Sequence, residues 1–463
     1  MLPAPLLQAI SARPGGRVAL IIGAGCSVED PTNLPMAKAI AVEAHQRLLA
    51  DSVLQAGECP NPEDLSSVAE AVFTKTGLQG PLVERMNPQR FQSAEPNQGY
   101  LLAAALLREN AIASLMTLNF DYAIGSALSQ LGARDTVTII RGPQDHSQMG
   151  LVNVIFLHRS AFSPFEDWIL RTTALETGWQ GRWEEVVASR VLTSPVTVFA
   201  GLGSPSRVLI ETTRKIREAI PNGTNVYQVD PLEPDKSAFF SQLNIPAGSY
   251  VQLSWGPFMK ELADRLLEQH RIELRNSCDD MTAAENIEHE NTAPICERFV
   301  GLGLLGFGKL RARWMLQRTS YVTHAGLDLA WIANLLLAIA LIERKTGTRA
   351  IICEDGIVEL YREDQIVSTL IFAHGRGSKR WLSVEAALHT LVAEHSRRNP
   401  RPRRAVVAGV QGPRRPAVGP PVNIVPTESS SSILPHAATI ETVDVEELRS
   451  DGPAVARLVA NEP

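Results

Sequence analysis

The sequence predicts an α/β fold with a doubly wound, mostly parallel sheet in its first 275 residues. Short apolar runs, each long enough for one strand and ending in glycine or a polar residue, alternate there with stretches of helical spacing. Runs that are apolar on both faces are typical of parallel strands that helices cover on both sides. Their alternation with helices indicates βαβ units, and therefore a doubly wound sheet.

The first strand is expected at Arg17–Ile22, and a helix follows at Met36–Ala50. A second helix is expected at Asn97–Glu109, where the side chain of Asn97 can cap the start. The alternation then continues with a strand at Ser114–Leu118, a helix at Asp121–Leu131, and strands at Thr136–Arg141, Val152–Leu157, Val196–Ala200 and Asn225–Val229. An amphipathic helix at Pro257–His270 is expected to close the domain.

Length, charge and cysteine usage limit the class of protein. The chain has 463 residues, enough for two or three domains, and a net charge of -6, which argues against a protein built to coat nucleic acid. Its five cysteines form no C-x-x-C pair, so no metal site is expected. No signal peptide is recognisable, and the apolar run Leu329–Ile342 is shorter than the roughly 20 residues that span a membrane. A cytoplasmic protein without membrane contact is expected.

Three further regions follow the first domain. Residues 276–292 are polar and acidic and are interpreted as a linker. Residues 293–396 predict a small α+β module with a helix at 327–343, a three-strand meander at 350–353, 357–361 and 366–372, and a helix at 383–395. Residues 397–463, rich in proline, arginine and serine, are expected to be mostly disordered. The basic patch of this tail is interpreted as solvated, and a nucleic-acid phosphate backbone is the alternative partner.

Chemistry-bearing residues gather where the predicted strands end, which is where a doubly wound sheet binds its ligands. The first strand runs into Gly23, Ala24, Gly25, Cys26 and Ser27. Two glycines there permit a tight turn and let a pyrophosphate approach the backbone. The third glycine of the dinucleotide fingerprint is missing, because Val28 stands in its place, and this argues against an ordinary dehydrogenase.

Two later strands end in residues suited to catalysis. Asn119 and Asp121 follow the strand at 114–118, and His158 ends the strand at 152–157. Each has a structural alternative: a turn for Asn119, a helix cap for Asp121 and a satisfied polar contact for His158.

The last two strands of the domain also end in candidate binding residues. Gly203 and Ser204 form a second glycine turn, and Asp230 ends a strand where an acid can hold ribose hydroxyls. The alternative for Asp230 is a turn aspartate before Pro231.

In this order the segments resemble the sirtuin superfamily, in particular the divergent sirtuin-like domains of bacterial antiviral defence proteins. The resemblance covers about Ala12 to Arg275. It is carried by GAGCS at 23–27, PNQGYLLAAALL at 96–107, TLNFD at 117–121, LHRS at 157–160, GLGS at 201–204 and VYQVD at 226–230.

The sequence departs from the protein-deacylating members of that family at three places. No cysteine lies between His158 and Gly203, so the family's four-cysteine zinc ribbon cannot form. Residues 28–35 read VEDPTNLP where deacylases have a PDFR-type segment, and Arg159 replaces the usual glycine after the histidine. The first two departures argue against protein deacylation and fit members that hydrolyse NAD.

The resemblance therefore implies a Rossmann-like, sirtuin-type domain without a zinc ribbon that takes NAD as substrate and releases nicotinamide and ADP-ribose. It implies that Asn119 and His158 flank the nicotinamide ribose and that His158, with a pKa near neutrality, takes a proton. Asp121 is expected either to steady the Asn119 loop or to offset the developing positive charge. The pyrophosphate is expected beside Gly23, Ala24, Gly25, Ser27, Gly203 and Ser204, and the adenosine ribose beside Asp230.

Unrestrained NAD hydrolysis would harm the host cell, so a gated effector of antiphage defence is expected. The module at 293–396 is the expected gate, acting through homo-oligomerisation, a ligand or a partner defence protein. The alternative is a non-catalytic sensor or interaction module that binds NAD or ADP-ribose without turnover.

Overall fold

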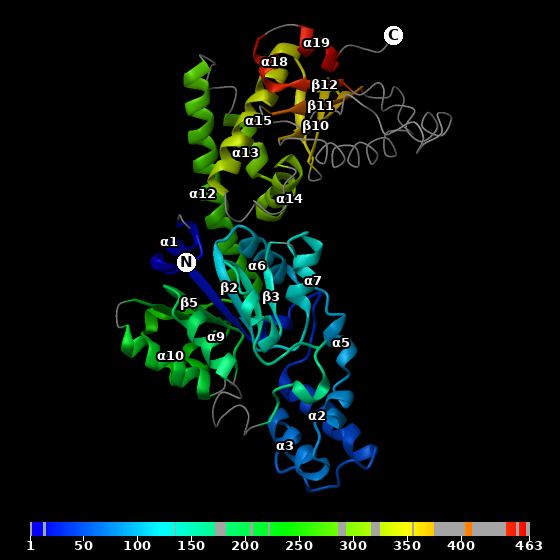
Figure 1. Ribbon diagram of the computed structural model, residues 1–463, viewed down its shortest axis with the longest axis vertical. Helices are drawn as coiled ribbons and strands as arrows, with labels where there is room; N and C mark the ends of the chain where they lie inside the picture. The colour runs from blue at the N-terminus through cyan, green and yellow to red at the C-terminus, as the bar shows by residue number, and fades with distance from the viewer. Residues whose placement is uncertain are drawn as a thin grey trace, which may run out of the picture. The chain divides into compact units, whose positions relative to one another are not determined.

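The computed structural model describes the chain apart from residues 1, 13–14, 135, 172–181, 204–206, 221–222, 286–292, 316–324, 354–355, 375–402, 410–440, 451–452 and 460–463. The chain divides into two compact units, Met1–Leu266 and Leu267–Pro463 (Figure 1). Helix α12, Trp255–Glu285, begins in the first unit and continues into the second.

Helix α12 corrects the predicted linker at 276–292. Residues 276–285 are helical, because Leu274 and Cys278 repeat at helical spacing and are buried in the core of the second unit. These two apolar residues gave no clear signal in the sequence, because the segment that follows Leu274 is mostly polar and acidic. Residues 286–292 lie outside the described residues.

The first unit is built on a seven-stranded sheet in the order β3-β4-β2-β1-β5-β6-β7. Every neighbouring pair is parallel, which confirms the predicted fold class. The strands are β1 Val18–Ile22, β2 Ile112–Thr117, β3 Thr138–Ile140, β4 Asn153–Phe156, β5 Val196–Ala200, β6 Asn225–Asp230 and β7 Tyr250–Gln252. The short edge strand β7 was not predicted.

Strand β1 lies at the centre, where the chain order of the sheet reverses. Its five residues are all buried, and β2 and β5 pair with its two sides. Ile22 is in register with Thr117 of β2 and Ala200 of β5, so the loops after these three strands begin at the same level. Such a reversal opens a crevice at the carboxyl ends of the strands, where doubly wound folds bind ligands.

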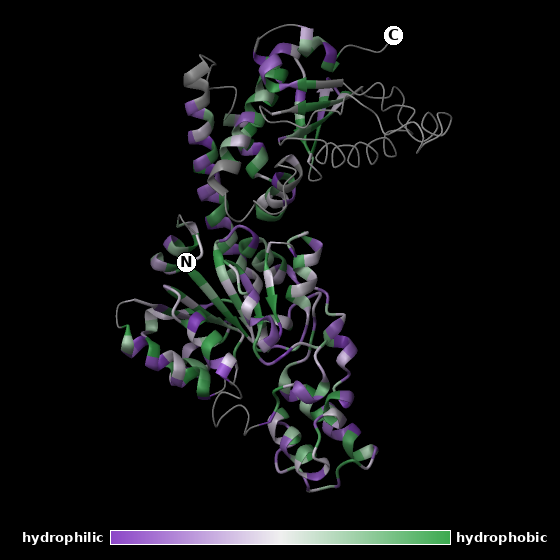
Figure 2. Ribbon diagram, in the orientation of Figure 1, coloured by the Kyte–Doolittle hydropathy of each residue, from purple (hydrophilic) through white to green (hydrophobic). Residues whose placement is uncertain are grey.

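Helices flank the sheet, and the strands form the most hydrophobic part of the unit (Figure 2). The predicted helices at 36–50, 97–109 and 121–131 are confirmed with ends shifted by a few residues, and Asn97 caps α6 by accepting the N–H of Tyr100. The helix predicted at 257–270 is confirmed as α12, which continues to Glu285. Three short helices between α2 and α6 were not predicted, and Figure 1 shows α2, α3 and α5 gathered beyond the carboxyl end of the sheet.

The helices before α12 are α1 Ala4–Ser11, α2 Ala37–Ala50, α3 Leu65–Thr76, α4 Gly80–Arg85, α5 Pro88–Gln92, α6 Gln98–Arg108, α7 Ala123–Gln130, α9 Arg182–Leu192, α10 Arg207–Ala219 and α11 Ala238–Leu243. The 3-10 helices are η1 Ala24–Ser27, η2 Pro143–Gln148, η3 Phe165–Asp167, η4 Pro234–Lys236 and η5 Ala247–Ser249.

The second unit contains a five-stranded mixed sheet in the order β12-β11-β10-β9-β8. The predicted meander is confirmed as the antiparallel strands β8 Arg349–Ile352, β9 Ile357–Arg362 and β10 Gln365–Ala373. Its described helices are α13 Ala293–Val300, α14 Gly303–Met315, α15 Ala325–Thr346, α18 Val445–Ser450 and α19 Pro453–Val459. The helix predicted at 383–395 lies outside the described residues.

The apolar run Leu329–Ile342 lies in α15 and is buried in the core of this unit, as predicted. Across the described residues, the helices are all too short or too polar to span a bilayer.

Four segments within the tail at 397–463 fold as part of this unit, and most of the remaining tail lies outside the described residues. Strand β11, Arg403–Ala408, pairs in parallel with β10, and β12, Glu441–Asp444, pairs in parallel with β11. The helices α18 and α19 also belong to this unit, and Val406, Val443 and Leu458 are fully buried. Each segment is too short to show a period in the sequence. Each is held by packing within this unit: β11 pairs with β10, β12 pairs with β11, and α18 and α19 pack against α15.

Candidate functional site

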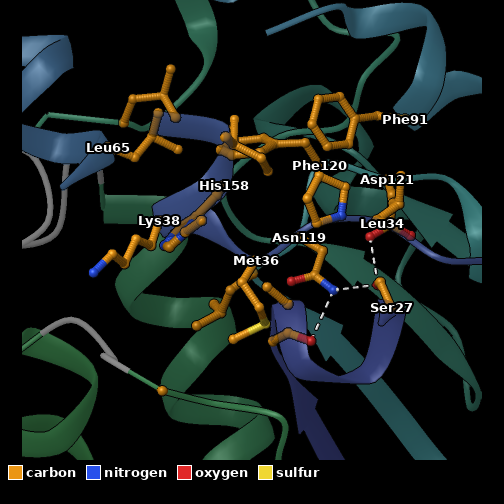
Figure 3. A pocket seen from close by; sticks show the side chains of 18 of the residues that line it. Ser27, Leu34, Met36, Lys38, Leu65, Phe91, Asn119, Phe120, Asp121 and His158 are labelled. Carbon is orange, nitrogen blue, oxygen red and sulfur yellow. Dashed lines mark hydrogen bonds between the residues drawn. The ribbon is translucent and has the colours of Figure 1, made fainter. Parts of the chain in front are cut away.

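A cavity of about 620 Å³ opens at the carboxyl ends of β1, β2, β4 and β5 (Figure 3). Seven predicted site residues line it: Gly23, Ala24, Ser27, Asn119, Asp121, His158 and Gly203. Gly25 and Asp230 are not among its lining residues, and Ser204 lies outside the described residues. Asp230 instead accepts a hydrogen bond from the backbone N–H of Leu232 at 2.9 Å, which is the turn contact given as its alternative.

The glycine turn after β1 packs against the turn after β5. Gly23 donates its N–H to Ala200 O at 3.0 Å, and Gly25 donates to Gly201 O at 2.9 Å. A Cβ atom on Gly23 would lie 2.5 Å from Leu202 Cδ2, and one on Gly25 would lie 2.8 Å from Gly201 Cα. Close contact between the two turns therefore requires these glycines. This differs from the expected reason, approach of a pyrophosphate, because both N–H groups are already used within the protein.

Asn119 connects the loop after β2 to the glycine turn. Its Nδ2 donates to Gly23 O at 3.0 Å and to Ser27 Oγ at 3.1 Å, and its backbone N–H donates to Thr117 Oγ1 at 3.0 Å. Figure 3 shows the amide nitrogen turned toward Ser27 and the amide oxygen turned away from it. The side chain is thus held in one orientation and presents its oxygen, an acceptor, to the cavity.

Ser27, Tyr100 and Asp121 form a buried hydrogen-bonded network beneath Asn119. Ser27 Oγ donates to Asp121 Oδ2 at 2.8 Å, so its single proton is used there. The contact of 2.7 Å between Ser27 Oγ and the Tyr100 hydroxyl must therefore be donated by Tyr100. Burial raises the pKa of Tyr100 well above its usual value, which keeps that hydroxyl protonated.

Asp121 is engaged by the protein through both carboxylate oxygens. Besides Ser27, it accepts the backbone N–H of Ala123, the first residue of α7, at 3.2 Å. Its pKa is raised because the carboxyl is buried, and hydrogen bonds from Ser27 and Ala123 act in the opposite direction. These contacts agree with the helix-start alternative and make Asp121 a positioning residue for Ser27.

His158 follows β4 and lines the same cavity as Asn119. Its pKa is lowered to about 4: burial is the main cause, a hydrogen bond with the Leu118 backbone acts in the opposite direction, and the Arg159 charge adds a smaller lowering. The expected pKa near neutrality is therefore wrong for this structure. The imidazole is neutral at pH 7 and has one unprotonated ring nitrogen, so it can accept a proton there, but as a weak base.

Replacing His158 by glutamine is expected to remove an acid-dependent loss of stability. A histidine of the unfolded chain titrates near pH 6.5 and the folded His158 near 4, so between these values the unfolded chain binds more protons. The wild-type free energy of unfolding therefore falls as pH drops from 6.5 to 4, by about 3 kcal/mol for this group. Urea unfolding of both proteins at pH 7 and pH 4.5 measures the difference. Equal losses in both would contradict this expectation.

Sequence reasoning missed Tyr100 and the apolar wall of the cavity. Met36, Leu65, Met86 and Phe91 come from the segments around α2 to α5 and cover the side away from the sheet. Tyr100 lies inside PNQGYLL, a segment noticed only as a helix, and its burial beside Ser27 gave no sequence signal. Lys38 of α2 also lines the cavity, and in Figure 3 its ammonium lies away from Ser27 and Asp121.

Comparison with known proteins gave matches among solved structures alone. No protein-family model and no curated protein matches the chain. A Sir2 homologue in complex with NAD matches at 16% identity and a TM-score of 0.36, covering 58% of this chain and 95% of its own. A mutant Sir2 homologue in complex with ADP-ribose matches at 16% identity and a TM-score of 0.36, covering 58% of this chain and 97% of its own. A structure described as a basis for the mechanism and regulation of Sir2 enzymes matches at 12% identity and a TM-score of 0.33, covering 57% and 98%.

Proposed function

We propose that this protein is an NAD hydrolase that cleaves the nicotinamide–ribose bond and releases nicotinamide and ADP-ribose. One observation carries the proposal: Asn119 after β2 and His158 after β4 line a single cavity with the glycine turn after β1. The three segments are far apart in the sequence and meet where the strand order of the sheet reverses.

The cavity fits a dinucleotide in size and in the chemistry of its walls. Its volume of about 620 Å³ lies within the range of roughly 300–1,000 Å³ that small-molecule and cofactor sites occupy. Apolar side chains such as Met36, Leu65 and Phe91 suit an aromatic ring, and the polar groups of Asn119 and His158 suit a sugar. Gly203, where an added Cβ would meet open space, leaves room for the pyrophosphate beside Ala24.

The chemistry asked of these residues is modest. Nicotinamide leaves as a neutral molecule, and the positive charge that develops on the ribose resembles that of glycoside hydrolysis. Asn119 orients a ribose hydroxyl or a water molecule through its amide oxygen, and neutral His158 takes the proton that is released. Asp121 acts through Ser27. Contact of Ser204 with the pyrophosphate and of Asp230 with the adenosine ribose remains part of the proposal.

Incubation of the full-length protein with NAD tests this function. Chromatography should show nicotinamide and ADP-ribose, or its cyclic form, appearing in equal amounts without any added acylated peptide. The Asn119→Ala variant, prepared in the same way, should release both products about 100-fold more slowly or not at all. A wild-type protein that leaves NAD intact at low and at high protein concentration, the range over which an oligomer would form, would refute hydrolysis.

A sensor that binds NAD or ADP-ribose without turnover is the second candidate. The low pKa of His158 favours it, because a group that titrates near 4 is a weak general base. Calorimetry with NAD, run beside the nicotinamide assay, separates the two functions. Binding without nicotinamide release supports the sensor.

We further propose that the hydrolase is a gated effector of bacterial antiphage defence and that the second unit supplies the gate, as a homo-oligomer or with a partner protein. Helix α12 offers a physical route, since its first residue, Trp255, packs edge-on against Tyr100 at 5.9 Å, and its residues from Leu267 belong to the second unit. If oligomerisation is the trigger, NAD loss per protein molecule rises with protein concentration. A constant value across the range in which the oligomer forms would exclude this trigger.

A further inference from the structure

Arg159, directly after His158, has a backbone conformation that arginine seldom adopts. Its φ of 80° lies in the left-handed region, where glycine is the residue with least strain. Non-glycine residues persist there when surrounding contacts hold them, and such residues cluster at functional sites. The side chain of Arg159 must therefore make contacts that offset this strain.

Those contacts join the turn after β4 to the first turn of α9. The guanidinium Nη2 lies 3.2 Å from Glu184 Oε1, and the two side chains are only 16% and 3% exposed. The guanidinium carbon also lies 5.0 Å from the centre of the Trp183 ring, a cation–π contact. Within the described part of the chain, the second oxygen of Glu184, Oε2, is buried without a hydrogen-bond partner. Glu184 is thus a buried carboxylate that depends on Arg159 for its countercharge.

The backbone around Arg159 is also tied to the loop that carries Asn119. Arg159 donates its N–H to Phe156 O at 3.3 Å, and Ala161 donates to Phe120 O at 2.8 Å, next to Asn119. His158 accepts the N–H of Ile169 through its carbonyl at 3.4 Å. A change at Arg159 therefore moves the backbone from which the His158 ring projects.

The charge of Arg159 acts on the same ring. Arg159 is not itself a lining residue of the cavity, and the charged groups that line it are Lys38, Asp64 and Asp121. Lys38 pairs with Glu63 at 2.6 Å, Asp64 accepts the N–H groups at the start of α3, and Asp121 is held by Ser27. Arg159 is the charge that acts on the titration of His158, and it disfavours the imidazolium.

We propose that Arg159 is a positioning residue for His158: its buried ion pair with Glu184 holds the turn that aims the imidazole into the cavity. The inference deepens the proposed function, because it assigns how the suggested proton acceptor is held. It also gives a physical role to the arginine that replaces glycine in the LHRS segment.

The test combines a titration that needs no substrate with NAD kinetics. The full-length wild type and the variants Arg159→Gln, Arg159→Lys and Glu184→Gln are labelled on their histidine rings, and the His158 signal is identified by its loss in His158→Gln. Arg159→Gln should raise the His158 pKa only slightly, because burial, the main cause of the low pKa, remains, and it should lower kcat about tenfold with little change in KM. Arg159→Lys, which retains the charge, should recover most of both properties. Glu184→Gln should lower kcat while the His158 pKa stays low, because burial and the positive charge remain.

Arg141→Gln is the matched control. Arg141 also lies over an aromatic ring, 5.6 Å from the centre of Tyr122, and donates to its hydroxyl at 2.9 Å, but it is not among the groups that shift the pKa of His158. It should leave the pKa of His158 and kcat unchanged. A folded Arg159→Gln or Glu184→Gln protein with wild-type kcat overturns the ion-pair clamp. If the wild type does not turn over NAD, the proposed hydrolysis fails, yet the His158 ring signal still decides whether the ion pair positions this residue, because an unchanged signal in Glu184→Gln overturns the inference.

Discussion

Asn119→Ala is expected to lower kcat for NAD cleavage by about 100-fold or more, because the group that orients the reacting ribose or water is removed. Unlike an exposed polar residue, Asn119 is fixed on three sides before any ligand binds, through Gly23, Ser27 and Thr117. Because the amide is already held in place before the reaction, truncating Asn119 removes its full contribution to the transition state. The effect is therefore expected in kcat more than in KM. Steady-state nicotinamide release by wild type and variant measures it.

The same substitution should also cost stability, which the experiment has to separate from activity. Gly23 O and Ser27 Oγ lose a donor in a buried place, at a cost of about 1–3 kcal/mol. Asn153→Ala is the matched control, since Asn153 is buried in the same unit, makes two hydrogen bonds with Gly150 and does not line the cavity. A folded Asn119→Ala protein with the kcat of Asn153→Ala would exclude Asn119 from the reaction.

Asn119→Asp distinguishes the two ends of the amide. It keeps an oxygen toward the cavity but replaces the nitrogen that donates to Gly23 O and Ser27 Oγ, close to the buried Asp121. We expect kcat to remain at least tenfold below wild type, because a carboxylate cannot donate to these acceptors and repels Asp121. Wild-type kcat in this variant would show that the donor side is dispensable.

His158→Gln is expected to lower kcat by about 10²–10⁴-fold, the usual contribution of a positioned proton acceptor. Glutamine keeps hydrogen-bonding capacity and comparable size but cannot take a proton near neutral pH, so the loss reports proton transfer. His146→Gln is the matched control, because His146 lies in η2 of the same unit and does not line the cavity. Equal rates in wild type and His158→Gln would remove His158 from the mechanism.

The pH dependence of wild-type activity is a second test of His158 as the proton acceptor. Because the pKa of His158 is about 4, the base form dominates at every pH above about 5, and kcat/KM should be flat there. Activity should fall as pH drops through 4, when the imidazole takes up a proton and can no longer accept one. A fall centred near pH 6.5 would instead indicate that His158 is exposed and ordinary in the active protein.

Much of the first unit was predictable because the apolar residues of its strands and helices repeat with a period that is visible within each short segment. The run Val18–Ile22 is apolar on both faces, which only a central parallel strand satisfies, and Asn97 announces a helix start by its type and position. The ends of three strands could be named as the place of chemistry because parallel strands end at one edge of a sheet. The roles of single residues were less accessible, as the two glycines show: they serve the contact between two turns.

Features that depend on contacts between segments far apart in the sequence were not predicted. Tyr100 joins the site through Ser27, 73 positions away, β11 becomes a strand by pairing with β10, and β12 by pairing with β11. The pKa of His158 also departs from the value that its residue type implies, because burial is a property of the whole fold.

The sequence by itself determined the doubly wound sheet and the positions of its strand ends, and it singled out Asn119 and His158 as candidate catalytic residues. These features were accessible because periodicity and residue type are local properties of the chain. Tertiary structure alone decided that these two side chains share one cavity, that Asp121 is occupied by Ser27 and Ala123, and that Arg159 is paired with Glu184. The physical reason is that hydrogen bonding, burial and charge pairing act over a few ångströms in space, between residues that the chain separates by tens of positions.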